Sequence, residues 1–408
     1  MLQDKVQRLL FPLFGLCLFA LSLGQFSVIY RFNDGSIYLF DILIALFDSI
    51  GVVYLLLLRK STKIPLPGLF LLVFCTLGAA SLVFTPLNLE PVELLTATSY
   101  LARFSSYVLF AAVTWNLVKL NVFQLCQMYR VIIYTGLLLF VAGLLQLFFL
   151  PDLETLDPSL GWDPHKNRMA STFFDPNFLG IYFIICLATT LKYKALSVKY
   201  SPINFFPTII FLAGILLTFS RSAWLAAAVL LLFALLRKKL LLLISLAIVL
   251  MAVFAIPRIQ TRISGITDPQ DSASYRLQSW QNTWEIAKEN WVFGVGYNTF
   301  RYAQKEQGFL DDSNLTARSS AGSDSSLLLV LATTGISGMF FFTGFFISAL
   351  LPAFKRADLI TAGLILALLV DSLFINSLFY PQIAAVMFLL IPNEMVAAKG
   401  FEPLTSAM

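Results

Sequence analysis

Three arginines lie where they could bind a phosphate-bearing substrate. Arg168, Arg221 and Arg276 each lie in a polar segment that borders a long apolar run. A guanidinium group binds phosphate oxygens through two parallel hydrogen bonds and stays charged at every physiological pH. We therefore expect the three side chains to meet at one membrane face and to bind an anionic lipid headgroup. The alternative for Arg221 is a side chain that merely reaches from an apolar helix to the membrane surface.

Other polar residues accompany these arginines. Asn177 begins an apolar run directly after Asp175 and Pro176, and Ser220 lies in the short turn that holds Arg221. The Asn177 amide and the Ser220 hydroxyl each need a hydrogen-bond partner if they enter the helix bundle. We expect substrate to be that partner for both residues. The alternative role for Asp175 is to cap the helix that follows it.

Asp324 directly precedes another apolar run and could accept a proton from a hydroxyl group. Helix capping is the more common role of an aspartate at such a position.

Arg103 lies about ten residues into its own apolar run, where a charge costs about 2.5–3.5 kcal/mol. It either binds substrate or pairs with Asp41 or Asp48, which are seven residues apart in one run. Asp371 lies in a later run with no obvious basic neighbour.

Composition decides the type of element that must position these residues. Of 408 residues, 58% are hydrophobic and 12% are charged, whereas soluble domains have about a quarter charged residues. This excludes a water-soluble fold, and the alternating segments of a β-barrel are missing from the sequence. We predict an all-α polytopic membrane helix bundle of about 12 transmembrane helices. The predicted spans are 9–28, 37–58, 66–84, 93–118, 129–150, 172–191, 203–219, 222–236, 239–256, 325–351, 357–376 and 378–397.

The spans divide the chain into three parts. Residues 1–256 would form helices 1 to 9, residues 257–324 an outer loop, and residues 325–408 helices 10 to 12. Within the loop, a helical spacing places Arg276, Trp280, Trp284, Ala287 and Trp291 on one face. Such a helix either lies in the membrane interface or packs over the mouth of the bundle. In both cases Arg276 stays near the membrane surface, and we expect Trp280 to contact substrate.

Basic residues indicate the orientation of the bundle. With the N-terminus inside, about sixteen of the 28 lysines and arginines fall in cytoplasmic segments and roughly four in short outward loops. This predicts a multi-pass inner-membrane protein with an even number of spans, both termini in the cytoplasm and the large loop facing the periplasm or exterior. The net charge of +5 lies in links between spans, so we expect the lipid bilayer, and no nucleic acid, as a partner.

Metal and cofactor sites are not expected. His165 is the single histidine, and the four cysteines lie inside apolar runs without the short spacing of a metal site. We predict no metal and no cofactor, and activity that is insensitive to EDTA.

Five segments, taken in order, resemble the O-antigen ligase and O-antigen polymerase superfamily. They are Arg168 to Gly180, Thr218 to Trp224, Arg276 with Trp280, Gly294 to Phe300, and Asp324 to Gly338. The resemblance covers residues 165 to 340. It implies a bacterial membrane glycosyltransferase of the GT-C type, which moves a glycan from undecaprenyl diphosphate to a sugar hydroxyl on the periplasmic side without a nucleotide sugar. It also implies that Arg221 and Arg276 hold the donor diphosphate.

The resemblance leaves several functions open. In the ligase branch, a His-Asn pair opens the segment that here reads Asp324-Ser325, and the histidine is proposed to be the base. The aspartate therefore favours a polymerase of repeat units or exopolysaccharide over a ligase that uses lipid A core as acceptor. The non-enzymatic alternative is a transporter or flippase for a lipid-linked glycan. A carrier should show inverted repeats or Gly/Pro-broken spans near the midplane, and we find neither in the sequence.

Overall fold

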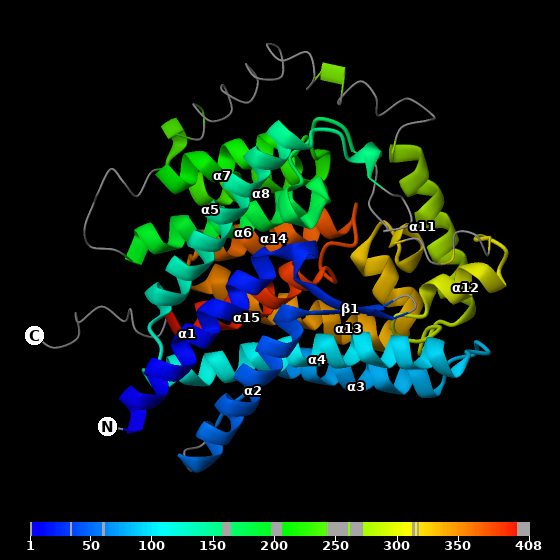
Figure 1. Ribbon diagram of the computed structural model, residues 1–408, viewed down its shortest axis with the longest axis horizontal. Coiled ribbons are helices and arrows are strands. Elements are labelled where there is room, and N and C mark those ends of the chain that lie inside the picture. Colours follow the sequence, from blue (N-terminus) through cyan, green and yellow to red (C-terminus); the bar gives the residue numbers. More distant parts are fainter. Residues whose placement is uncertain are drawn as a thin grey trace, which may run out of the picture.

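Long apolar runs form a bundle of helices in the computed structural model (Figure 1). The structure describes residues 2–32, 35–58, 62–156, 165–196, 206–241, 243, 260–261, 272–311, 315 and 318–397. The longer helices are α1 (Leu2–Ser22), α2 (Leu39–Leu57), α3 (Leu66–Val83), α4 (Pro91–Lys119), α5 (Leu125–Phe149), α6 (Pro176–Leu196), α7 (Phe206–Leu217), α8 (Arg221–Leu235), α11 (Ser272–Glu289), α12 (Phe300–Glu306), α13 (Ser326–Lys355), α14 (Leu359–Ser372) and α15 (Pro381–Ala397). Short 3-10 turns are η1 (Gly24–Ser27), η2 (Leu153–Thr155), η4 (Ser171–Phe173) and η8 (Arg318–Ala321).

The prediction of an all-α membrane bundle is confirmed. Among the described residues, α2, α3, α4, α5 and α13 are long and apolar enough to cross a membrane, and α7, α8, α14, α15 and most of α1 are shorter apolar helices. Most of the predicted ninth span, 239–256, lies outside the described residues. The count of twelve spans and the division into three parts therefore stay predictions.

One link between helices contains strands that we did not predict. β1 (Val28–Phe32) and β2 (Gly35–Tyr38) pair antiparallel, with Val28 opposite Tyr38. The predicted first span, 9–28, instead ends at Ser22, where Gly24 adopts a positive φ of 54° and starts a turn. A hairpin pairs its own backbone groups, so it can close this link without a partner sheet.

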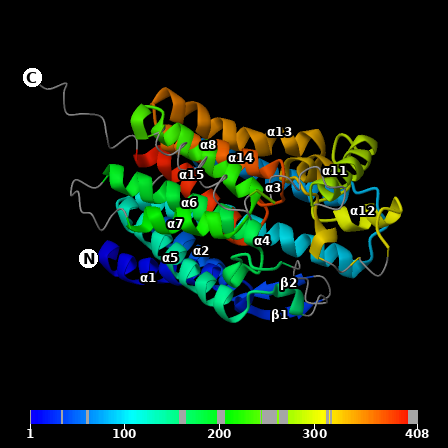
Figure 2. The same ribbon diagram turned by 90° about the horizontal axis from the view of Figure 1, so that it is seen from above.

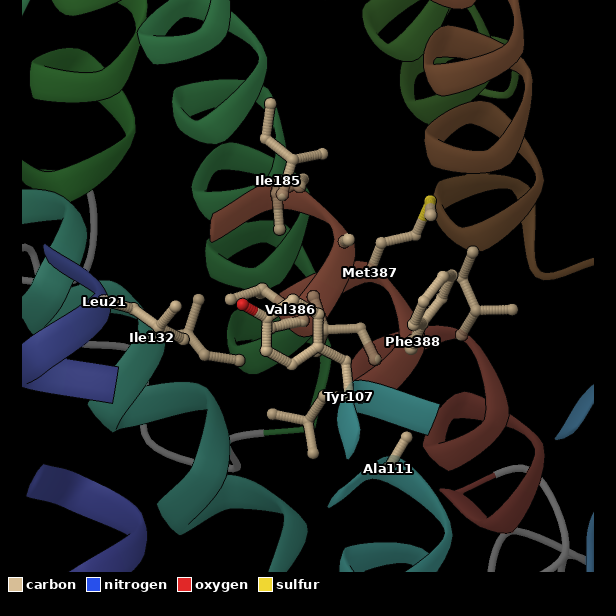
Figure 3. Close-up of a cluster of buried hydrophobic side chains, with 14 of the residues drawn as sticks. Leu21, Tyr107, Ala111, Ile132, Ile185, Val386, Met387 and Phe388 are labelled. Atoms are coloured by element: carbon tan, nitrogen blue, oxygen red, sulfur yellow. The ribbon is translucent and has the colours of Figure 1, made fainter. Parts of the chain in front are cut away.

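Helices far apart in the sequence pack through small residues. α8 packs extensively on α14 and also on α6, while α3 packs on α13 and α4 on α15. A Cβ atom on Gly180 of α6 would lie 2.6 Å from the Ala223 Cβ of α8, so the two backbones approach closely. Figure 3 shows the buried centre, where α1, α4, α5, α6 and α15 contribute Leu21, Tyr107, Ala111, Ile132, Ile185, Val386, Met387 and Phe388.

The non-membrane elements gather at one end of the bundle. The hairpin, α11 and α12 lie at the end opposite the start of α1 in both views (Figures 1 and 2). We call this the loop end. It contains the starts of α8, α11 and α13, which carry the predicted site residues, so the chain assembles one region from three separate segments.

A break interrupts α13 at Gly335, inside the predicted span 325–351. Gly335 has φ 67° and ψ −169°, far from helical values. A straight helix of 30 residues would be about 45 Å long, and the 14 residues of α14 about 21 Å. Yet Ser325, just before α13, donates a hydrogen bond to the carbonyl of Ser372 at the end of α14. The first part of α13 therefore turns across the loop end, and the part from Gly335 to Lys355 is about 30 Å long, enough to cross a bilayer.

Candidate active site at the loop end

Arg168 joins two of the predicted segments. Its side chain is 6% exposed. Its Nε donates to the Thr218 carbonyl at 2.8 Å, and its Nη2 donates to Asn177 Oδ1 at 3.0 Å. The Ser220 hydroxyl donates to the same amide oxygen at 2.8 Å. Arg168, Asn177 and Ser220 thus form one buried hydrogen-bonded network, which holds the turn immediately before Arg221.

Local capping explains why this network forms. Asp175 Oδ1 accepts hydrogen bonds from the backbone N–H groups of Asn177 (2.7 Å) and Phe178 (3.4 Å), so it caps α6 as in our alternative interpretation. Pro176 is the first residue of α6, where its missing N–H costs nothing. The cap directs Asn177 into the bundle, toward Arg168 and Ser220.

Arg221 is the first residue of α8. Ser220 is the N-cap of this helix, with its hydroxyl accepting from the Ala223 N–H at 3.5 Å. Phe219 has a positive φ of 47° in the tight turn between α7 and α8. The N-terminus of a helix has unpaired N–H groups and a partial positive charge, both of which favour an anion. The half-buried Arg221 adds a full positive charge at this position.

Arg276 of α11 is also half-buried and interacts with charges from four other segments. Burial lowers the pKa of its guanidinium, the Asp324 carboxylate raises that pKa, and the Arg221 cation lowers it. Asp371 and Asp175 raise it further. Such interactions weaken with distance, so Arg221, Asp324, Asp371 and Asp175 lie in the neighbourhood of Arg276.

Asp324 lies in the link that precedes α13. Ser325 is the N-cap of α13, with its hydroxyl accepting from the Leu328 N–H at 3.4 Å. The capping role that we gave as an alternative for Asp324 is thus performed by Ser325. Burial raises the pKa of the Asp324 carboxyl, Arg276 lowers it, and Asp175 raises it, with a raised pKa as the result. A carboxylate with a raised pKa is a stronger base than an ordinary aspartate.

Trp280 contacts Asp324 through the backbone. Its indole Nε1 donates to the Asp324 carbonyl at 3.1 Å, and its ring centroid lies 6.0 Å from that of Phe374. Trp280 thus holds the link before α13, and its contact with substrate stays a prediction.

The helical face of α11 is only partly as predicted. Thr283, Ile286 and Ala287 are fully buried on the side of α11 that packs on α13. Trp284 is 47% exposed and Trp291, which lies beyond the end of the helix, is 43% exposed. The helix therefore packs over the mouth of the bundle and leaves two tryptophans at its edge.

Asp371 is a residue of this region that our site prediction missed. It is fully buried at the end of α14, and its carboxylate lies beside the hydroxyls of Ser222 and Ser377. Neither oxygen makes a hydrogen bond of ordinary geometry there. The sequence contained one signal, a lone carboxylate in an apolar run, because such a group is costly without a partner. The partners come from α8 and the link after α14, which no sequence spacing reveals.

Arg103 lies in a different cluster. Its Nε donates to Asp41 Oδ1 at 3.0 Å and its Nη2 to Asp41 Oδ2 at 2.8 Å, while Tyr107 donates to the same carboxylate at 3.2 Å. The guanidinium also lies over the Tyr100 ring, 4.9 Å from its centroid. This is the ion pair that we gave as the alternative for Arg103. Its role in substrate binding stays a prediction, separate from the group around Arg276.

Comparison with known proteins yields one family. Residues 206–343 match the family model described as O-antigen ligase. This range contains Ser220, Arg221, Arg276, Trp280 and Asp324, and it leaves out Arg103, Arg168, Asn177 and Asp371. A search of curated proteins finds no match to the chain.

Proposed function

We propose that this chain, which belongs to the O-antigen ligase and polymerase superfamily through residues 206–343, moves a glycan from a polyprenyl diphosphate to a sugar hydroxyl. Family membership and its apolar helices make the chain an integral membrane protein that processes glycans. The observation that carries the finer proposal is the electrostatic grouping of Arg276 with Arg221 and Asp324. It combines two cations suited to a diphosphate with one carboxylate suited to a hydroxyl proton.

The two arginines form the donor site in this proposal. Arg221 extends from the N-terminus of α8 and Arg276 from α11, so the diphosphate would lie between two helices. The two cations repel each other, and this repulsion contributes to the lowered pKa of Arg276. A diphosphate placed between them would remove the repulsion, which favours binding of the anion. We propose undecaprenyl diphosphate as the lipid carrier, as the superfamily resemblance implies.

The transfer step needs one base and one stabilised leaving group. The acceptor hydroxyl oxygen forms a bond to the anomeric carbon, and its proton passes to the Asp324 carboxylate. The bond between the anomeric carbon and the diphosphate oxygen breaks, and both electrons of that bond leave with the diphosphate. Arg221 and Arg276 stabilise the negative charge that develops there, so no general acid is required. The step uses neither a metal nor a cofactor.

The acceptor class follows from the residue at position 324. A carboxylate stands where the ligase branch has a histidine, so we propose a polymerase of repeat units or exopolysaccharide rather than a ligase to lipid A core. The loop end would face the periplasm, because the positive charges of the short links favour the opposite side as cytoplasmic. The break in α13 does not favour the carrier alternative, since Gly335 lies about a full bilayer thickness from the Lys355 end rather than at the midplane.

The decisive experiment uses the purified full chain in lipid nanodiscs with lipid-linked repeat units and, separately, lipid A core. We expect longer glycans on the lipid carrier. Transfer to lipid A core would identify a ligase instead, and movement of the substrate across a vesicle membrane without any new glycosidic bond would identify a carrier. Arg276→Gln should reduce kcat/KM by about 100- to 1,000-fold, whereas Arg130→Gln, at an exposed position on α5, should leave it unchanged.

A further inference from the structure

The segment from Trp291 to Gly296 fills the break in α13. The N–H of Val295 donates to the Ala332 carbonyl at 2.9 Å, and the N–H of Gly296 donates to the Thr333 carbonyl at 3.0 Å. On the other side of the break, the Ile336 N–H donates to the Trp291 carbonyl at 2.8 Å. Backbone groups that a broken helix leaves unpaired are thus satisfied by the outer loop.

Two glycines allow this contact. Gly335 and Gly294 both have a positive φ, 67° and 69°. A Cβ atom on Gly335 would lie 2.2 Å from the Val292 carbonyl oxygen, and one on Gly294 would lie 2.4 Å from the Thr333 carbonyl carbon. The two backbones therefore meet at a distance that no other residue type permits at either position.

α11 binds the chain before α13 at a second place. The N–H of Asp324 donates to Ser279 Oγ at 3.0 Å, and Thr283 Oγ1 donates to Ser323 Oγ at 2.7 Å in a fully buried contact. Ser279 is three residues after Arg276, so the two side chains lie on the same side of α11. One helix therefore carries the cation of the site and the groups that hold the backbone of the carboxylate.

We propose that Ser279, Thr283 and Gly294 are positioning residues, through which residues 272–300 of the outer loop place Asp324 opposite Arg276. The α11 contacts fix the backbone of residues 323 and 324, and the contact at Gly294 keeps α13 broken, so that its first part lies across the loop end. This inference rests on the proposed function for the role of Asp324 as base, but the hold of the loop on residues 323–334 can be measured by itself.

Kinetics of the full chain in nanodiscs test the positioning role. In Ser279→Ala/Thr283→Val, we expect kcat to fall roughly ten- to a hundredfold, because small displacements of a reacting group have effects of this size. KM for the lipid-linked donor should stay within about twofold, since Arg221 and Arg276 remain. Thr343→Val is the matched control, because within the described part of the chain the Thr343 hydroxyl bonds only carbonyls of its own helix at Met339 and Phe340.

The pH profile separates positioning from a general loss of folded protein. Arg276 of α11 and Asp175 before α6 act on the Asp324 carboxylate, and Arg221 of α8 and Asp371 of α14 act on Arg276. Burial raises the pKa of Asp324, so a loosened Asp324 should become more exposed and its pKa should fall. The acid limb of kcat should then move to lower pH in the double variant. A loss of folded protein would lower kcat without moving this limb.

Hydrogen exchange gives a readout that needs no transfer. Backbone amides of residues 323–334 should exchange faster in Ser279→Ala/Thr283→Val and in Gly294→Ala than in Thr343→Val. If both variants exchange these amides and turn over substrate at the rates of Thr343→Val, the positioning role is overturned. If the unmodified chain transfers no glycan, the proposed function fails. The contact between the outer loop and residues 323–334 is judged by hydrogen exchange alone in that case. Faster exchange in the variants would support this contact, and unchanged exchange would overturn it.

Discussion

Asp324 and Arg276 are each in surroundings that disfavour their own charge and are stabilised by the charge of the other. Burial raises the pKa of Asp324 and lowers that of Arg276, while each group shifts the pKa of the other in the opposite direction. Charged groups with perturbed pKa values that gather in one place are typical of sites that do chemistry. Asp175 and Asp371 add negative charge to the same region, so the proposed diphosphate would have to compete with these carboxylates for Arg276.

Asp324→Asn should lower kcat by about 100- to 10,000-fold, because the amide cannot accept the hydroxyl proton. In the proposed step the carboxylate is the active form, and its pKa is raised by burial. Activity should therefore decline as the pH falls through that raised pKa, above the usual aspartate range, and the asparagine variant should lack this limb. A pH series of kcat on both proteins measures this. Asp152→Asn, in the exposed pair with Lys166, should retain the activity and profile of the unmodified chain.

Removal of one partner from the Arg103–Asp41 pair should destabilise the protein. The side chains are 12% and 18% exposed, and an unpaired buried charge costs about 3–5 kcal/mol. Arg103→Met or Asp41→Leu alone should lower the unfolding temperature in detergent, and the double variant should recover part of the loss. If the double variant is stable but its KM for the donor is much increased, Arg103 binds substrate as the sequence predicted.

At the scale of elements, α13 performs two tasks with one apolar run. Its second part, from Gly335 to Lys355, is long enough to cross a bilayer, and its first part brings Ser325 to the end of α14 at Ser372. An unbroken helix of this length would carry Ser325 far beyond Ser372. The break brings Asp324 to the level of Asp371, and the outer loop makes the break stable in an apolar environment.

Gly335→Ala should distort this arrangement. Its Cβ would meet the Val292 carbonyl oxygen at 2.2 Å, at a φ that alanine rarely adopts, so we expect a loss of about 1–3 kcal/mol or a shifted first part of α13. Gly15→Ala in α1 is the matched control, since a Cβ there meets nothing within 4 Å. Thermal unfolding in detergent compares the two. Equal unfolding temperatures would contradict the need for glycine at 335.

At the scale of the whole molecule, polar and apolar surfaces are separated along the bundle. The hairpin, α11 and α12 lie at one end, and the Lys192–Asp358 ion pair, at 2.5 Å, joins the end of α6 to the start of α14. Between these ends the exposed surface of the helices is largely apolar, as at Leu144, Leu225 and Phe340. Such a surface is suited to lipid, and the site lies where the apolar surface ends.

Cysteine labelling in intact cells should establish the orientation. A membrane-impermeant maleimide should react with Glu306→Cys at the loop end, and with Arg356→Cys, between α13 and α14, only after the membrane is permeabilised. Both positions are exposed. The unmodified chain, with its four cysteines, measures background labelling. Reversed accessibility would place the loop end in the cytoplasm and contradict the positive-inside interpretation.

The sequence by itself determined the class of fold and several of the residues to test. Apolar runs of sufficient length must be helical in lipid, since every backbone group needs an internal partner there. Arg221, Arg276 and Asp324 could be selected because a charge beside such a run is costly unless it has a use. The ordered segments around them also predicted the O-antigen ligase and polymerase superfamily, and residues 206–343 match the model of the O-antigen ligase family.

Only the tertiary structure decided which of these charges meet. Arg103 pairs with Asp41, Arg168 supports the turn before Arg221, and Asp371 joins the group around Arg276. Sequence spacing relates residues along one helix, whereas these partners lie on different helices, and their meeting depends on which faces pack. The break at Gly335 was equally hidden, because its cause is the backbone of residues 291–296, more than thirty positions away in the chain.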